Sequence, residues 1–243
     1  MRISRVLGRI QVVPCGVCRQ LKYKALSKRL YAGEVKTFGV VLKESHPGYR
    51  HAGVVVSTSP RGALRILHLA GHCDFSNDEY DNTYTLIPNC NFSQGELDYL
   101  AEKALRLWDK NGNDIAYGLD FDGTDPFGFD LKFMGDDGRG LTCATFVLAF
   151  LRKCGFPLLD VGSWKFRAED EKFQQLVFDH YTRKNALTDE QVVRMKASVG
   201  NAARFRPEEV VACFSHYDED LIGFDQGQKF GMEILNELSM ELV

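Results

Sequence analysis

Short runs of hydrophobic residues in the first third of the chain predict a small antiparallel sheet. Residues 53–59 and 63–70 are rich in Val, Ile and Leu, and the segment 59–62, Ser-Pro-Arg-Gly, carries turn-forming residues. This arrangement predicts a β-hairpin. Tyr84 to Ile87 predicts a third strand, which Pro88 ends because proline cannot donate to a ladder.

Further along, hydrophobic residues recur at helical spacing and predict two helices. Ser93 and Glu96 have the spacing of a capping box, and apolar positions three or four residues apart follow them up to the pair 111–112, Asn-Gly. A second helix is expected from about 142 to 153, and Gly155 stops it.

The last part of the chain has a different pattern. Residues 166–243 look helical, with polar surface positions and no strand signal. We therefore predict an α+β protein with a domain at residues 1–160, in which an antiparallel sheet packs on the helix at 142–153. Residues 161–243 are expected to form a helical accessory region.

Composition narrows the classes of function. The chain has 243 residues, and 33 acidic against 30 basic side chains give a formal net charge of −3. Such a balance offers no broad electrostatic reason to bind nucleic acid or an anionic membrane. No apolar run reaches the roughly 18 residues of a membrane span, and Arg9 interrupts the one apolar stretch near the N-terminus. We expect a protein of the cytoplasm, or one exported without a cleavable signal peptide.

The cysteines indicate thiols rather than a disulfide framework. There are seven of them at irregular spacings in a chain large enough to form a core. Cys15 and Cys18 have the CxxC spacing of zinc knuckles and redox motifs, but a zinc site needs about four ligands and no second such pair follows. We expect no metal ion and no cofactor, with chemistry at this pair as the alternative.

Cys143 is the candidate nucleophile. A loop with Gly138 and Gly140 runs into a helix that is apolar nearly all round, and Cys143 lies in its first turn. Unpaired backbone N–H groups and the positive end of the helix dipole favour a thiolate there. The N–H groups of Cys143 and Ala144 are candidate donors to the oxyanion of a tetrahedral intermediate. The two glycines are expected to let a substrate approach the sulfur. The alternative is that Cys143 is only a core residue, since free cysteines are often buried.

Histidines on the predicted hairpin supply a candidate base. If the turn centres near residue 60, position 51 lies opposite position 70. His68 and His72, two residues to either side of position 70, then lie diagonally near His51 on one face of the sheet. One imidazole is then able to take the thiol proton while another fixes its tautomer. We predict His51 as the general base and His68 as its orienting partner, with His72 as the alternative third residue.

Three segments in order resemble a known family. His51-Ala52-Gly53-Val54-Val55-Val56, Leu67-His68-Leu69-Ala70 and Thr142-Cys143-Ala144-Thr145-Phe146-Val147 resemble the two histidine motifs and the cysteine motif of circularly permuted NlpC/P60 proteins. The lecithin–retinol acyltransferase-like group belongs to that set. The resemblance covers about residues 46–155.

The resemblance implies a permuted papain-like fold and a cysteine hydrolase or acyltransferase. Cys143 would be the nucleophile, His51 the general base and His68 the third polar residue. The expected chemistry is cleavage of an amide or ester bond through a thioester acyl-enzyme, on a peptide, amide or acyl substrate. Cell-wall peptides attacked by a bacterial effector are one substrate class that the resemblance suggests.

Two other kinds of function stay open. One is a non-catalytic binding module on the same scaffold, whose C-terminal helices contact a protein partner. The other rests on residues 115–119, a strand-like piece followed by Asp120, a further residue and Asp122. This segment looks like the first motif of Mg²⁺-dependent haloacid dehalogenase-type phosphatases. A second strand-like piece spans residues 127–133.

Overall fold

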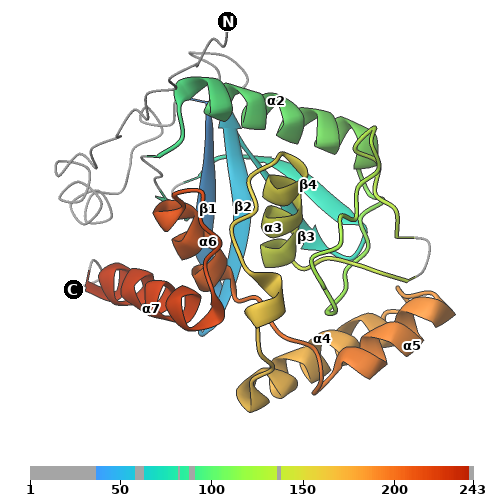
Figure 1. Cartoon of the computed structure of the whole chain (residues 1–243). Helices are drawn as coiled ribbons and strands as arrows, with labels where there is room; N and C mark the ends of the chain where they lie inside the picture. The colour runs from blue at the N-terminus through green and yellow to red at the C-terminus, as the bar shows by residue number, and fades with distance from the viewer. Residues whose placement is uncertain (1–36, 58–62, 82, 88–90, 136–137, 241–243) are drawn as a thin grey trace, which may run out of the picture.

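The structure is a computed structural model that describes residues 37–57, 63–81, 83–87, 91–135 and 138–240. The expected turn at 59–62 lies outside these ranges, and so do Pro88 and the CxxC pair Cys15 and Cys18. The described part of the chain is an α+β fold, as expected. Its sheet is covered on one side by helices (Figure 1).

The sheet has five antiparallel strands in the order β4-β3-β2-β1-β5. The strands are β1 Phe38–His46, β2 Tyr49–Ser57, β3 Leu64–Gly71, β4 Asp74–Glu79 and β5 Thr85–Ile87. The predicted hairpin is β2 and β3, and the predicted third strand is β5. Strands β1 and β4 were not predicted.

The described residues form six α-helices, which cover one side of the sheet or extend from it: α2 Gln94–Asn111, α3 Cys143–Lys153, α4 Glu171–Arg183, α5 Asp189–Ser198, α6 Pro207–His216 and α7 Phe224–Met240. Two short 3-10 helices, η2 Val161–Ser163 and η3 Ala168–Asp170, precede α4. The capping box of Ser93 and Glu96 is present at the start of α2, as predicted. Gly155, at φ 92°, follows α3 and stops it as expected.

Side-chain alternation gives the sheet two apolar faces. Val54 of β2 and Leu67 of β3 belong to the main core, together with residues of α2, α3 and α6. Val55 and Ile66, one position along each strand, belong to a smaller cluster with Tyr84 on the other face. Residues of opposite parity in β2 therefore lie on opposite sides of the sheet.

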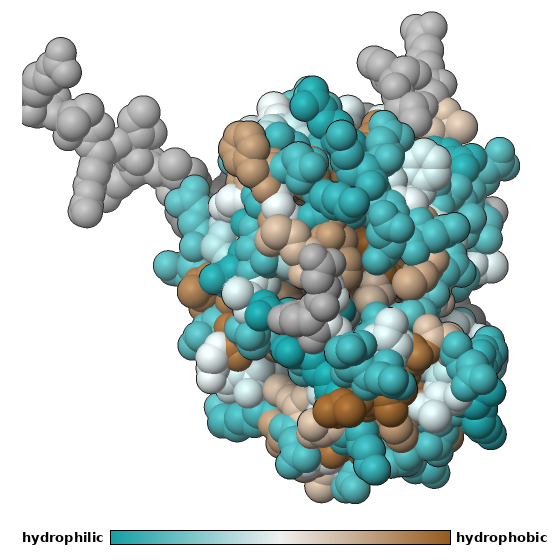
Figure 2. Space-filling model, turned by 90° about the vertical axis from the view of Figure 1, so that its right-hand side faces the viewer, coloured by the Kyte–Doolittle hydropathy of each residue, from teal (hydrophilic) through white to brown (hydrophobic). Residues whose placement is uncertain are grey.

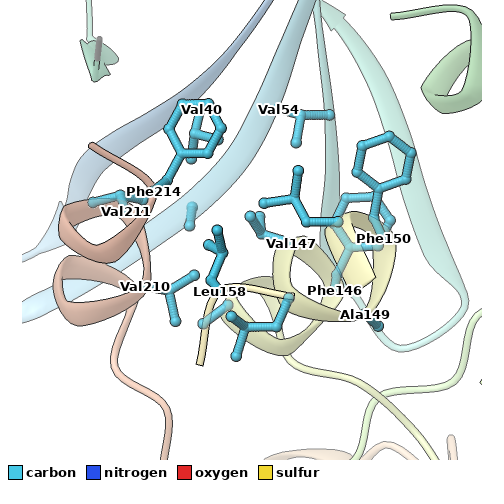
Figure 3. Packing of buried hydrophobic residues seen from close by; sticks show 14 of the residues in the cluster. Val40, Val54, Phe146, Val147, Ala149, Phe150, Leu158, Val210, Val211 and Phe214 are labelled. Carbon is cyan, nitrogen blue, oxygen red and sulfur yellow. The ribbon is translucent and has the colours of Figure 1, made fainter. Parts of the chain in front are cut away.

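The C-terminal region is helical, as predicted, but it is not peripheral to the core. Helix α6 packs on β1, β2 and α3, and its Val210, Val211 and Phe214 meet Val147 and Val54 in one cluster (Figure 3). A helix whose residues are nearly all buried is a core helix. Residues from both sides of position 160 therefore share one hydrophobic core.

The segment between α2 and α3 forms loops rather than strands. The two expected strand-like pieces contribute only isolated bridges, Tyr117 to Leu141 and Phe127 to Phe133. The first bridge brings Gly118 and Gly140 together so closely that a Cβ on Gly140 would lie 2.4 Å from the Tyr117 carbonyl carbon. Gly140 is therefore required by a crossing of two backbones, a role that we did not predict.

None of the helices in the described ranges combines the length and hydropathy needed to cross a membrane. The face seen in Figure 2 is mostly hydrophilic, and hydrophobic residues gather near its lower end. Figure 1 places α4 and α5 at that end of the molecule. These helices carry Leu176 and Val193, which are 44% and 71% exposed.

Candidate active site

Cys143 is the first residue of α3. Its neighbour Thr142 caps the helix, because the Thr142 side chain accepts from the Thr145 N–H while the Thr145 hydroxyl accepts from the Thr142 N–H. This reciprocal cap fixes the point at which the helix begins. Cys143 is 7% exposed, and it lines a cavity of about 530 Å³.

The sulfur of Cys143 faces backbone donors. Burial raises the pKa of the Cys143 thiol, although the backbone N–H groups of Ala52, Ala144 and Cys143 itself and the charge of Arg204 act in the opposite direction. Burial thus favours the neutral thiol over the thiolate that we expected at the helix start, while the nearby backbone N–H groups favour negative charge on the sulfur.

On the face of the sheet that is turned away from α3, three side chains form a chain of hydrogen bonds. The Nε2 atom of His51 lies 2.7 Å from Nδ1 of His68, and Nε2 of His68 lies 2.9 Å from Oδ2 of Asp78. His68 is buried, whereas the Asp78 side chain is 63% exposed. Register explains the meeting, because β2 and β3 pair Val54 with Leu67, and the same register sets position 51 opposite position 70.

This chain assigns the tautomer of each ring. A carboxylate only accepts, so Nε2 of His68 carries the hydrogen and donates to Asp78. With His68 in this tautomer, its Nδ1 atom accepts from the Nε2–H of His51. The remaining nitrogen of His51, Nδ1, holds a lone pair, and no hydrogen bond to the described residues occupies it.

Burial keeps His51 neutral. Desolvation, with smaller contributions from the neighbouring His68 and Lys43, lowers the pKa of His51 to about 3. An imidazole of this kind is neutral across the physiological pH range. It gains no charge until a reaction delivers a proton to it.

Cys143 and His51 lie on different sides of β2, although both residues border the same cavity. Ala52 packs into the helix-side core and its N–H reaches the sulfur, whereas His51 belongs to the other face. Both Cys143 and His51 border the cavity. No hydrogen bond joins the sulfur to either ring among the described residues, so the structure brings the pair to one cavity without direct contact.

His72 lies away from this group. Strand β3 ends at Gly71, and His72 falls in the turn to β4 next to Cys73, whose φ is 54°. The Nδ1 atom of His72 accepts from the Tyr117 N–H at 3.2 Å. Burial lowers its pKa, against a hydrogen bond to Ala186. The structure places His68, and not His72, against His51.

The aspartates of the alternative phosphatase motif are in surroundings that do not suit that reaction. Asp120 pairs with Arg194, and Asp122 accepts from the Thr124 N–H at 2.9 Å in a local turn. That motif requires a preceding parallel strand, but residues 115–119 form no strand, and every ladder of the described sheet is antiparallel. The described sheet therefore lacks the parallel strand that the phosphatase interpretation requires.

Sequence reasoning missed two parts of the site. Asp78 belongs to β4, where Phe75 is the one large apolar residue, so no period-two signal marked the strand. The second part is the cavity wall from α4 and the segment before α6, which includes Phe173, Tyr181 and Arg204. A possible signal was the aromatic and basic character of α4, but its approach to Cys143 depends on tertiary packing.

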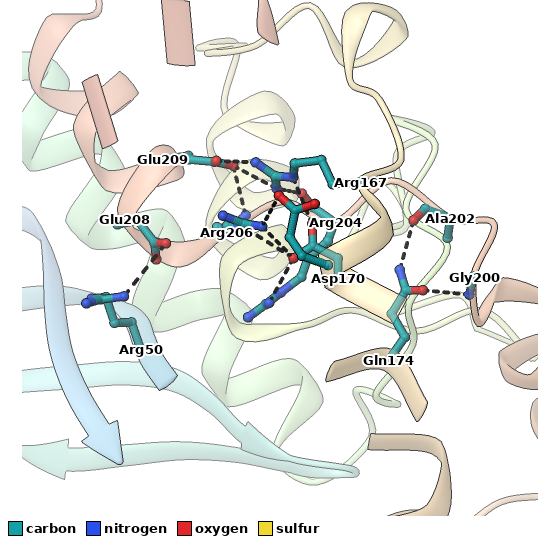
Figure 4. A network of polar contacts seen from close by, with 11 residues as sticks. Arg50, Arg167, Asp170, Gln174, Gly200, Ala202, Arg204, Arg206, Glu208 and Glu209 are labelled. Carbon is teal, nitrogen blue, oxygen red and sulfur yellow. Dashed lines mark hydrogen bonds and ion pairs between the residues drawn. The ribbon is translucent and has the colours of Figure 1, made fainter. Parts of the chain in front are cut away.

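A polar network holds this wall in place (Figure 4). Asp170, 1% exposed, accepts from Arg167 at 2.8 Å, from Arg204 at 3.1 Å and from Arg206 at 2.9 Å. Arg167 also pairs with Glu209 of α6. The network therefore ties the start of α4 to α6 and to the segment that carries Arg204.

No protein-family model, no curated protein and no solved structure matches this chain.

Proposed function

We propose that the protein is a cysteine hydrolase or acyltransferase of the permuted papain-like type, with Cys143 as nucleophile and His51 as general base. One observation carries the proposal. The hydrogen-bond chain from Asp78 through His68 leaves His51 neutral with an unprotonated Nδ1, at a cavity that also holds a thiol at a helix start.

The reaction starts from a neutral pair. Nδ1 of His51 takes the proton of Cys143, directly or through one water, as the sulfur attacks the carbonyl carbon of an amide or ester. The N–H groups of Cys143 and Ala144 donate to the oxyanion. His51 returns the proton to the departing amine or alcohol, and a thioester remains. Water, or an acceptor amine or alcohol, then loses a proton to His51 as it attacks the thioester, and His51 passes this proton to the leaving Cys143 sulfur as the acyl group is released.

Acylation by a chromogenic ester tests the proposal. The full chain is incubated with 4-nitrophenyl butyrate, and peptide mass spectrometry locates the added butyryl group. We expect a thioester on Cys143, a burst of nitrophenol, and loss of both in Cys143→Ala. His51→Ala is expected to slow acylation about 10²- to 10⁴-fold, the usual contribution of a general base.

Cys213→Ala is the matched control, because Cys213 is also a free, buried cysteine but does not border the cavity. It should retain the burst. An adduct on another residue, or an undiminished burst in Cys143→Ala, would refute the proposal.

A second candidate is a non-catalytic binding module. The raised pKa of Cys143 and the missing sulfur–imidazole hydrogen bond among the described residues favour it. The same experiment separates the two, since a binding module forms no acyl-enzyme with any activated ester.

A further inference from the structure

The cavity next to Cys143 combines apolar walls with positive charge. Its volume of about 530 Å³ is typical of sites for small organic molecules. Apolar side chains border it from β3, α4 and the segment before α6: Leu69, Ala70, Phe173, Leu176, Val177, Ala203 and Phe205. These walls suit an acyl chain or another apolar group.

The charged residues around the cavity are all basic. Arg50, Arg183 and Arg204 border it, together with three histidines, whereas no aspartate or glutamate of the described chain does. The three arginines come from β2, from the end of α4 and from the segment before α6, so they surround the cavity instead of forming one surface stripe. A whole protein with a slight negative charge thus concentrates positive charge at one site.

The three arginines differ in how far their charge is balanced. Arg50 lies 3.9 Å from Glu208, and Arg204 shares Asp170 with two other arginines while it covers the Phe173 ring at 3.5 Å. Arg183 donates from Nε to the Asp179 carbonyl at 3.1 Å, and no carboxylate of the described residues pairs with it. Its guanidinium therefore keeps donors for an incoming group.

We propose that the substrate is an anionic amphiphile, with an apolar part against the cavity walls and a carboxylate or phosphate bound by Arg183. This inference rests on the proposed function, since it names the substrate class of the same site. An arginine binds either anion through two parallel hydrogen bonds, and it discriminates against neutral and cationic analogues by charge.

Binding to Cys143→Ala tests the inference without any turnover. Calorimetric titrations use four probes with one ten-carbon chain, each below its micelle-forming concentration: decanoate, decyl phosphate, decanol and decyltrimethylammonium. We expect at least one of the two anions to bind most tightly of the four probes, and the cation to bind most weakly. The difference in affinity between decanoate and decyl phosphate shows which headgroup the site prefers. Rising ionic strength should weaken the binding of the anion.

Arg183→Gln in the same background should weaken anion binding about three- to tenfold, the range of a partly exposed ionic contact. It should leave decanol binding unchanged, and Arg183→Lys should restore part of the loss. Arg152→Gln is the matched control, because it removes an exposed arginine of α3 that does not border the cavity. Equal affinities of decanol and both anions, or equal effects of the two glutamine variants, would overturn the inference.

The outcome separates this inference from the proposed function. Selective anion binding without an acyl-enzyme in the wild type would support the anion-binding site and refute the proposed enzymatic activity. An acyl-enzyme on Cys143 with no preference for anions would support the proposed enzymatic activity and refute the inference of an anionic substrate.

Discussion

At the scale of single residues, the site is organised around neutral groups. A resting thiolate–imidazolium pair is the arrangement that a helix-start cysteine suggests, but burial pushes Cys143 and His51 toward their uncharged forms. The backbone N–H groups around the sulfur stabilise negative charge only as it develops. Proton transfer is therefore coupled to attack on the substrate in the mechanism that we propose.

The neutral state of His51 makes folding stability depend on pH. In the unfolded chain His51 takes up a proton near its ordinary pKa of 6.5, but in the folded protein only near 3. Between these two pH values the unfolded state binds more protons than the folded state. The contribution of His51 to the free energy of unfolding is therefore complete above pH 6.5 and decreases as the pH falls. The slope from this one group reaches about 1.4 kcal/mol per pH unit.

We expect His51→Gln to weaken the decrease in the free energy of unfolding as the pH falls below 6.5. Urea unfolding at pH 7, 6, 5 and 4 measures the slope for both proteins. Some slope should remain in the variant, because burial also lowers the pKa of His72. Identical slopes would show that His51 is charged in the folded protein.

At the scale of elements, the start of α3 is fixed by a backbone crossing. Residues 117–118 and 140–141 pass so closely that neither Gly118 nor Gly140 tolerates a Cβ without displacement of backbone atoms. The position of the Cys143 sulfur relative to Ala52 depends on this crossing, since Gly140 precedes it by three residues.

Gly140→Ala is expected to cost about 1–3 kcal/mol of unfolding free energy through overpacking, and to slow acylation of Cys143. Denaturant unfolding and the ester burst measure the two effects. Gly95→Ala is the control, because a Cβ there meets nothing within 4 Å and its helical position favours alanine. Should both variants keep wild-type stability, the crossing does not constrain the site.

At the scale of the whole molecule, Asp170 links elements that are far apart in the sequence. Replacing it by Asn leaves Arg167, Arg204 and Arg206 around a neutral group, and we expect a loss of about 3–5 kcal/mol in thermal or denaturant unfolding. Glu169→Gln should cost less than about 1 kcal/mol, because the Glu169 side chain is 66% exposed and, among the described residues, pairs only with Arg206. Equal losses would argue against the network as an anchor.

Sequence patterns predicted the elements that carry strong local signals. The β2–β3 hairpin, α2 with its capping box and α3 were predicted because their apolar spacing and caps are local. The meeting of His51 and His68 followed from register alone. Asp78 was missed because an edge strand of polar residues has no apolar period, and α6 was assigned to an accessory region because its core contacts are all long-range.

The shared core has a consequence for how the protein is made. The cavity wall includes residues between 173 and 207, and α6 fills the space beside α3. We therefore expect the nucleophile-bearing helix to be synthesised many residues before the segments that complete its surroundings. During that interval we expect the Cys143 thiol to lie on an incomplete surface that oxidants and chaperones can reach.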